Sequence, residues 1–343
     1  MMPNLNQIFL DSFPEAAVMT AQGQVTASNL MARHFLPQLE PGIPTPSYLS
    51  LTQSPSSAGT FTVGLSTYSF RLTQLPEGLL ILFRPAPQSA LTDAQLDGAL
   101  RQLRTFMEDF LLEAGNPSSD SRASFYKSFY RMFRLLDNME LIRIAGSPEG
   151  LPFSPVSMDL AGLCDQVIAE AAPLLLEGGI TLDYRSSLPS LLIPGDPKLL
   201  QRLLLELISN AARASGTGTI LIQLFRKEAH AILSLSNRDN PLTQRQLVAM
   251  FHQDTDQLLP SPESGAGLGL SIVRHITALH EGTLLVEFGQ DTPAIVLSLP
   301  TGPLTPRVTV STPLVQRDGG LSPLLAALSD ALPASVFYLA DFD

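Results

Sequence analysis

Glu206, Asn210 and Arg213 are polar residues spaced one helical turn apart, so on a helix they lie along one face. A carboxylate, an amide and a guanidinium in such a row can serve a metal ion, a metal-bound phosphate and phosphate oxygens. The same row taken alone could equally be a solvated helix face. It therefore needs a second, independent feature before it indicates a nucleotide site.

A glycine-rich stretch supplies that second feature. Gly265, Gly267 and Gly269 run directly into apolar residues at helical spacing, which predict a helix over Leu268–His280. Backbone N–H groups at such a turn, together with the positive end of the helix, can hold phosphate. No Gly-Lys-Ser/Thr follows, so the stretch is not a Walker loop, and without a preceding strand it is a poor dinucleotide fingerprint. The predicted phosphate-contacting backbone belongs to Gly265, Gly267, Leu268, Gly269 and Leu270.

Together the two stretches resemble the asparagine box and the second glycine box of the ATPase domain shared by histidine kinases, gyrase-type topoisomerases and certain chaperones. The lead-in Gly195–Arg202 and the exit His280–Leu284 are also similar to those of histidine kinases. The resemblance implies ATP and Mg²⁺ as ligands, with Asn210 holding the metal and Arg213 contacting phosphate. It gives Glu206 a catalytic role, in which it orients or deprotonates a water or supports the metal.

The sequence departs from this family at the first glycine box. Where the family has Asp-x-Gly-x-Gly, Asn237 stands in place of the adenine-reading aspartate, and both glycines are lost. Residues 236–242 could also be only a hydrophilic turn. In addition, the loop 252–264, which would cover the phosphates, contains no lysine or arginine and offers little help to charge developing in phosphoryl transfer.

Residues 154–300, which contain the candidate site residues, are predicted to form an ATP-binding domain. Helices and strands alternate in an order that predicts a two-layer α/β sandwich. The predicted helices are 159–176, 196–214, 243–251 and 268–280, and the predicted strands are 180–185, 219–225, 231–235, 284–288 and 294–299.

Residues 88–146 are predicted to form an antiparallel helical hairpin. Apolar residues alternate spacings of four and three, as in a heptad seam, which two copies of the hairpin would bury in a four-helix bundle. The alternative is a monomeric hairpin packed on the ATP-binding domain. The seam residues are Leu96, Leu100, Leu103, Met107, Phe110, Ala114, Phe125, Phe129, Met132, Leu136 and Met139.

A histidine kinase carries its phospho-acceptor in this hairpin, within His-Glu-Leu-Arg-Thr-Pro. The matching stretch here is Arg101–Phe106, so Arg101 occupies the degenerate acceptor position. All five histidines lie outside both helices, and arginine offers no nucleophilic nitrogen at usable pH. The sequence therefore predicts that histidine autophosphorylation is lost in the hairpin.

Residues 1–87 resemble a PAS sensor domain in the order of their elements. The expected strands are 16–20, 25–27, 60–64, 68–75 and 79–84, with a short helix or strand start at 6–13 and a helix over Ser28–Phe35 capped by Ser28. No cofactor ligand stands out, and His34 reads as a surface or packing residue.

The remaining features limit partners and location. A net charge of −11 makes nucleic acid a poor partner. No apolar run reaches the roughly 18 residues of a membrane span, the N-terminus is not a signal peptide, and Cys164 reads as core, so a cytoplasmic location is expected. Residues 301–343 are a tail with an amphipathic helix 321–332 and a possible strand 336–339, which could dock on the ATP-binding domain or on a partner.

These observations predict a multidomain α+β, histidine-kinase-like signalling protein that binds ATP and Mg²⁺ as a pseudokinase and forms a homodimer. A response regulator or another signalling protein is the expected partner. Two alternatives stay open: an active kinase whose acceptor lies elsewhere or on a partner, and a scaffold that has lost nucleotide. Nothing in the sequence identifies the sensed signal.

Overall fold

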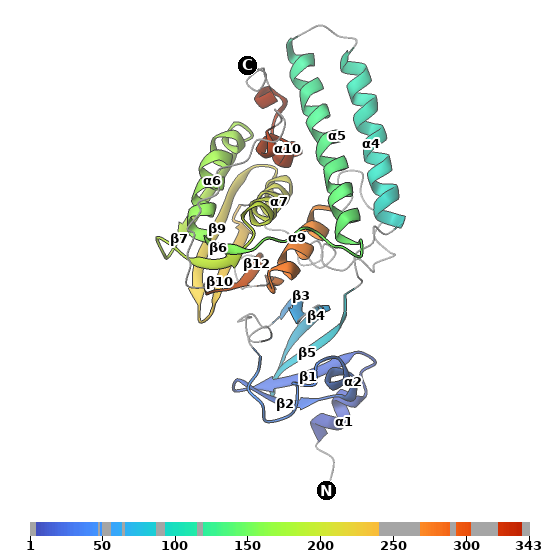
Figure 1. Cartoon of the computed structure of the whole chain (residues 1–343), viewed down its shortest axis with the longest axis vertical. Helices are drawn as coiled ribbons and strands as arrows, with labels where there is room; N and C mark the ends of the chain where they lie inside the picture. Colours follow the sequence, from blue (N-terminus) through green and yellow to red (C-terminus); the bar gives the residue numbers. More distant parts are fainter. Residues whose placement is uncertain are drawn as a thin grey trace.

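The computed structural model describes residues 5–46, 49, 56–63, 66–86, 93–114, 119–239, 268–288, 293–302 and 322–337. Its described elements form an N-terminal sheet, a pair of long helices and a mixed α/β part (Figure 1). No helix among these residues is long and apolar enough to cross a membrane.

The N-terminal part is an antiparallel sheet of five strands in the order β2-β1-β5-β4-β3. An aromatic cluster of Phe61, Tyr68, Phe70 and Phe83 fills its core. The predicted strands are all present, and the likeness to a PAS domain stays a prediction. The elements are α1 (Leu5–Asp11), β1 (Ala16–Ala21), β2 (Gln24–Ser28), α2 (Leu30–Phe35), β3 (Ser56–Val63), β4 (Ser66–Leu75) and β5 (Gly78–Pro85).

The predicted cap of α2 was wrong by one residue. Asn29, not Ser28, caps the helix, because its side-chain oxygen accepts from the backbone N–H of Ala32 at 2.9 Å. Ser28 instead donates its hydroxyl to the carbonyl of Leu39 at 2.6 Å. Both residue types can cap a helix, so the choice depends on a tertiary contact that local sequence does not contain.

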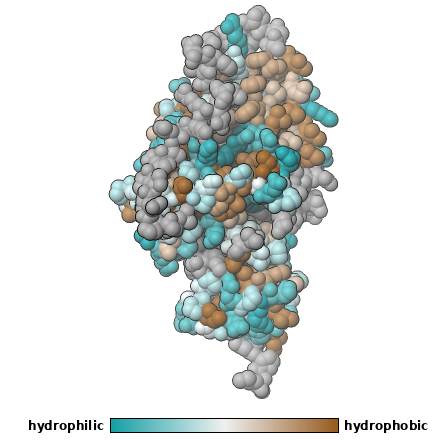
Figure 2. Space-filling view, in the orientation of Figure 1, coloured by the Kyte–Doolittle hydropathy of each residue, from teal (hydrophilic) through white to brown (hydrophobic). Residues whose placement is uncertain are grey.

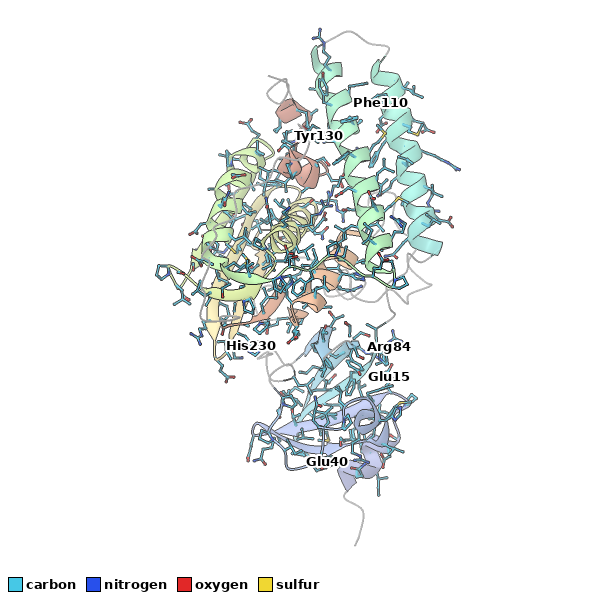
Figure 3. All side chains as sticks on the ribbon, viewed as in Figure 1. Glu15, Glu40, Arg84, Phe110, Tyr130 and His230 are labelled. Carbon is cyan, nitrogen blue, oxygen red and sulfur yellow. The ribbon has the colours of Figure 1, made fainter. Side chains whose placement is uncertain are left out.

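The long helices α4 (Asp93–Ala114) and α5 (Ser119–Ala145) lie side by side (Figure 1). Phe110 lies between them, with its ring centroid 4.2 Å from that of Phe125 (Figure 3). Much of the predicted seam faces outward in the single chain, where Leu96, Leu100, Met107, Phe129 and Leu136 are exposed. Figure 2 shows hydrophobic residues gathered over this helix pair.

The α/β part follows the predicted alternation of helices and strands. Its helices lie on one face of its sheet (Figure 1). Two strands, β6 and β8, were missed, because each has only four residues and shows little alternation; they pair with each other in a separate two-stranded sheet. The predicted helix 243–251 lies outside the described residues. The elements are β6 (Val156–Asp159), α6 (Leu160–Glu177), β7 (Ile180–Ser186), β8 (Leu192–Gly195), α7 (Pro197–Ser215), β9 (Gly218–Lys227), β10 (His230–Asn237), α9 (Leu268–Leu279), β11 (Thr283–Phe288) and β12 (Pro293–Pro300).

The two sheets are continuous. β3 pairs antiparallel with β11, which gives one ten-stranded sheet in the order β2-β1-β5-β4-β3-β11-β12-β10-β9-β7. At the junction Gly59 faces Leu285, and a Cβ on Gly59 would lie 2.3 Å from the carbonyl oxygen of Leu284. Ile232, Leu285 and Val296 join the N-terminal core. The N-terminal part therefore covers part of the second sheet.

The C-terminal segment, residues 322–337, contains α10 (Pro323–Leu328), capped by Ser322, and the 3₁₀ helix η1 (Ala334–Phe337). The predicted helix is shorter than expected, and the possible strand at 336–339 was wrong where the structure describes it. Leu324, Leu328, Leu332 and Phe337 are buried in the core of the α/β part. The segment therefore packs on the same chain.

Candidate functional site

The start of α7, the helix that carries the candidate site, is fixed by two contacts. The side chain of Asp196 accepts from the backbone N–H groups of Lys198 and Leu199 at 3.0 and 3.3 Å, and Pro197 occupies the first turn, where no N–H is needed. The backbone N–H of Asp196 donates to Nε2 of His280 at 3.0 Å. The helix that follows the glycine stretch is thereby tied to the start of α7.

His280 is a buried, neutral imidazole in this arrangement. Its Nδ1 lies 2.7 Å from the carbonyl of Ile276 and must donate, because a carbonyl only accepts; Nε2 is then the acceptor. Burial lowers the pKa of His280, although the hydrogen bond to Ile276 and the charge of Asp196 act the other way. Protonation would place a second donor against the N–H of Asp196.

The two predicted stretches meet where α9 begins. A Cβ on Gly269 would lie 2.5 Å from Oε2 of Glu206 and 3.6 Å from Nδ2 of Asn210. The first turn of α9 therefore approaches Glu206 so closely that a Cβ at position 269 would require the carboxylate to move. Leu268 and Leu270 point into the core, so they can offer only backbone to a ligand. Gly265 and Gly267 lie outside the described residues.

Glu206 has no exposed surface and is paired with two arginines. Its Oε2 lies 2.8 Å from Nη2 of Arg134 on α5, and its Oε1 lies 3.3 Å from Nε of Arg202 on α7. Burial alone would lower the pKa of Arg134, but the charges of Glu206 and Asp330 raise it. In this conformation the carboxylate faces guanidinium groups and has no exposed surface to offer a water.

Asn237 lies at the end of β10, where the adenine-reading residue is predicted. It is buried, and its Nδ2 donates to the carbonyl of Ala211 on α7 at 3.2 Å. This bond fixes the amide so that the donor side faces α7. Arg213 lies near the end of α7 and is exposed, while desolvation by the surrounding protein lowers its pKa.

Comparison with known proteins identifies the domain around this site. Residues 195–303 match the histidine kinase-, DNA gyrase B- and HSP90-like ATPase family. The sensor kinase SilS of Salmonella typhimurium is 30% identical over 32% of this chain and 22% of its own length. CusS of Escherichia coli K12 is 25% identical over 50% of this chain and 35% of its own length. SenX3 of Mycobacterium tuberculosis H37Rv is 28% identical over 62% of this chain and 47% of its own length.

The chain therefore contains a histidine-kinase-like ATPase domain and is related to two-component sensor kinases. It aligns with less than half the length of each of these curated relatives. Among solved structures, Acinetobacter baumannii histidine kinase AdeS is 15% identical, with a TM-score of 0.46 over 60% of this chain and 97% of that one.

Arg101, at the predicted acceptor position, is exposed on α4. Two residues that matter at the site escaped the sequence reasoning. Arg134 lies on the face of α5 that meets α7, and Asp330 lies in the C-terminal segment. The available signal was that Asp330 is the only charge within the apolar stretch 321–337. Its partners could not be found by spacing, because they are far away in the sequence.

Proposed function

We propose that the protein binds an adenine nucleotide with Mg²⁺ between α7 and the start of α9. The supporting observation is the approach of Gly269 to Glu206 and Asn210, which brings the first turn of α9 against the polar face of α7. Backbone N–H groups at a helix start favour phosphate. Asn237, at the adjoining end of β10, would contact adenine. Gly265 and Gly267 would extend the phosphate loop.

Mg²⁺ fits this site as a shared ion. It commonly takes one or two protein oxygens and completes its shell with water and nucleotide phosphates. No group of three or more His, Cys, Asp or Glu side chains that could hold a metal occurs in the described part of the chain. Asn210 is then the protein ligand and Arg213 the phosphate contact. When bound, the ion would neutralise phosphate charge.

We further propose that the protein signals through conformation and partner binding, as a pseudokinase. No histidine lies in α4 or α5 to accept a phosphoryl group. The outward-facing apolar seam of these helices supports a homodimer formed through them. A response regulator is the partner class that the family resemblance implies, and a cytoplasmic location stays a prediction.

Calorimetric titration of ADP with and without Mg²⁺ tests the nucleotide site. Asn210→Ala should abolish the Mg²⁺-dependent part of binding, because it removes the metal ligand. Lys198→Ala, an exposed position on the same helix, is the control and should bind as the parent does. Identical titrations for Asn210→Ala and the parent would rule out this assignment.

Incubation with labelled ATP tests the pseudokinase proposal. We expect no acid-labile, base-stable label within residues 93–145. Such a label there would refute the assignment of Arg101 to the acceptor position. A stable label elsewhere on the chain would show an active kinase with another acceptor.

A further inference from the structure

The C-terminal segment, residues 322–337, lies between the helix pair and α7 (Figure 1). Phe337 packs against Tyr130 of α5, with ring centroids 5.4 Å apart, at the face of α5 that the segment covers (Figure 3). Pro333 approaches the end of α6 near Gly178. The segment thus contacts both the helix pair and the α/β part, which residues 146–155 connect.

Asp330 is the charged centre of this contact. Its Oδ1 lies 2.9 Å from Nε of Arg131, and its Oδ2 lies 3.0 Å from Nη1 of Arg134. Arg134 uses its other terminal nitrogen for Glu206 at 2.8 Å. One guanidinium therefore bridges a carboxylate of the C-terminal segment and a carboxylate of α7.

The remaining groups around this bridge also join α5 to α7. Arg202 of α7 pairs with Asp137 of α5 at 2.6 Å and donates to Asn138. Arg131 stacks over Phe106 of α4, with its guanidinium carbon 4.2 Å from the ring centroid. The helix pair is thus held on α7 by charges, most of which are buried or half-buried.

We propose that residues 322–337 are an autoinhibitory clamp, in which Asp330 holds α5 on α7 and keeps Glu206 paired with Arg134 and away from Mg²⁺-nucleotide. The claim that the clamp inhibits nucleotide binding rests on the nucleotide site proposed above. The claim that the segment holds α5 on α7 does not depend on that site.

Two physical effects make the clamped state a poor nucleotide binder. Glu206 cannot support a metal while its oxygens face Arg134 and Arg202, because those pairs would have to break first. Asp330 also places a negative charge close enough to act on Arg213, the proposed phosphate contact. By linkage, nucleotide that binds the released state better must loosen the clamp to the same extent.

Two variants that change the net charge in opposite directions show whether nucleotide affinity depends on the clamp or only on the charge near the site. Asp330→Asn removes a negative charge and Arg131→Gln removes a positive one, yet both break the same ion pair. Asp183→Asn and Arg185→Gln are the matched controls, since they break an exposed ion pair on β7. The measurements on the full chain are calorimetric titration of ADP with excess Mg²⁺, and hydrogen exchange of residues 322–337 without nucleotide.

We expect both clamp variants to bind ADP about fivefold more tightly, which is a modest allosteric coupling. Both should also speed exchange of residues 322–337, and the controls should match the parent. Opposite shifts in affinity for the two clamp variants would show a charge effect alone and overturn the inhibitory role. Unchanged exchange would overturn the clamp, whatever ADP does. Faster exchange with no ADP binding by any protein would leave the clamp standing and refute the nucleotide site together with its inhibition.

Discussion

The type and spacing of Glu206 predict a role at a metal ion or a water, but a tertiary contact pairs its buried carboxylate with Arg134 instead. Its place beside Asn210 on one helix face follows from spacing, and both residues do lie against the start of α9. Its pairing with Arg134 does not follow from spacing, because the two residues are 72 positions apart on different helices. Taking either charge away would leave the other buried and unpaired, which costs several kcal/mol.

At the same scale, sequence similarity marked His280 only as part of the exit from the glycine helix. The hydrogen bond from the backbone of Asp196 gives it a structural role at the start of α7. That role depends on a neutral ring, which the burial of the imidazole favours and which no sequence pattern displays.

We predict that the protein loses stability as pH falls below about 6.5, the ordinary pKa of histidine. Burial lowers the pKa of His280 in the folded state, so the unfolded chain takes up the proton first. The stabilisation is therefore complete above the unfolded pKa and decreases as pH falls through it. Urea unfolding at pH 7.5 and 5.5 measures this loss.

His280→Gln provides the comparison for this prediction. The variant should be less stable at pH 7.5 but should lose less on acidification than the parent. His230 and His275, whose pKa values burial also lowers, remain in both proteins and cancel in the comparison. An equal loss in parent and variant would contradict the role assigned to His280.

At the scale of elements, hydrophobic periodicity predicted most helices and strands, with ends shifted by one to a few residues. In α4 and α5 it predicted a seam, whereas the residues most deeply buried in the single chain belong to a different stripe, which includes Ala99, Phe106, Tyr130 and Ile142. Hydrophobic periodicity identifies an apolar face of a helix, but it does not identify the element that packs against that face. Here one stripe is buried within the chain, and part of the predicted seam is exposed in the single chain.

We predict that Leu111→Asp disrupts a homodimer without unfolding the chain. Leu111 is 68% exposed on α4 near the outward seam, so a charge there costs little in the monomer. In a packed dimer the same charge would be buried without a partner. Light scattering should show the mass fall by half.

Leu176→Asp is the control for this experiment, because Leu176 is 63% exposed on α6, away from the helix pair. It should leave the parent mass unchanged. A parent protein that is already monomeric, or a Leu111→Asp variant that stays dimeric, would contradict dimerisation at this face.

At the scale of the whole molecule, the continuous sheet is the feature that the sequence did not predict. Each sheet was anticipated as a separate layer from its own alternating strands. Nothing local to β3 or β11 indicates that they pair, because their backbone hydrogen bonds are independent of side-chain pattern. The need for a glycine at position 59 can be recognised only once β11 is known to lie against it.

We predict that Gly59→Val separates the N-terminal part from the rest of the chain. A Cβ at this position would lie 2.3 Å from the carbonyl oxygen of Leu284 and 2.6 Å from the Cα of Leu285, both of which are backbone atoms. The β3–β11 pairing must therefore open. Small-angle scattering should show a larger radius of gyration, and limited proteolysis should release the N-terminal part as a folded fragment.

Thr62→Val, in the same strand just beyond the stretch paired with β11, is the control and should leave both measurements unchanged. If Gly59→Val keeps the dimensions of the parent, the junction tolerates a side chain and the two sheets are not held together here.

The pairing of β3 with β11 also constrains how the chain can be made. Phe61 faces Thr283, so residues 1–288, which end with β11, must leave the ribosome before this junction can close. Until then the finished N-terminal sheet presents β3 as an open edge, and such edges readily pair with strands of other chains. Long-range pairing of this kind also forms slowly. A chaperone that covers β3 during synthesis would protect the nascent protein at this edge.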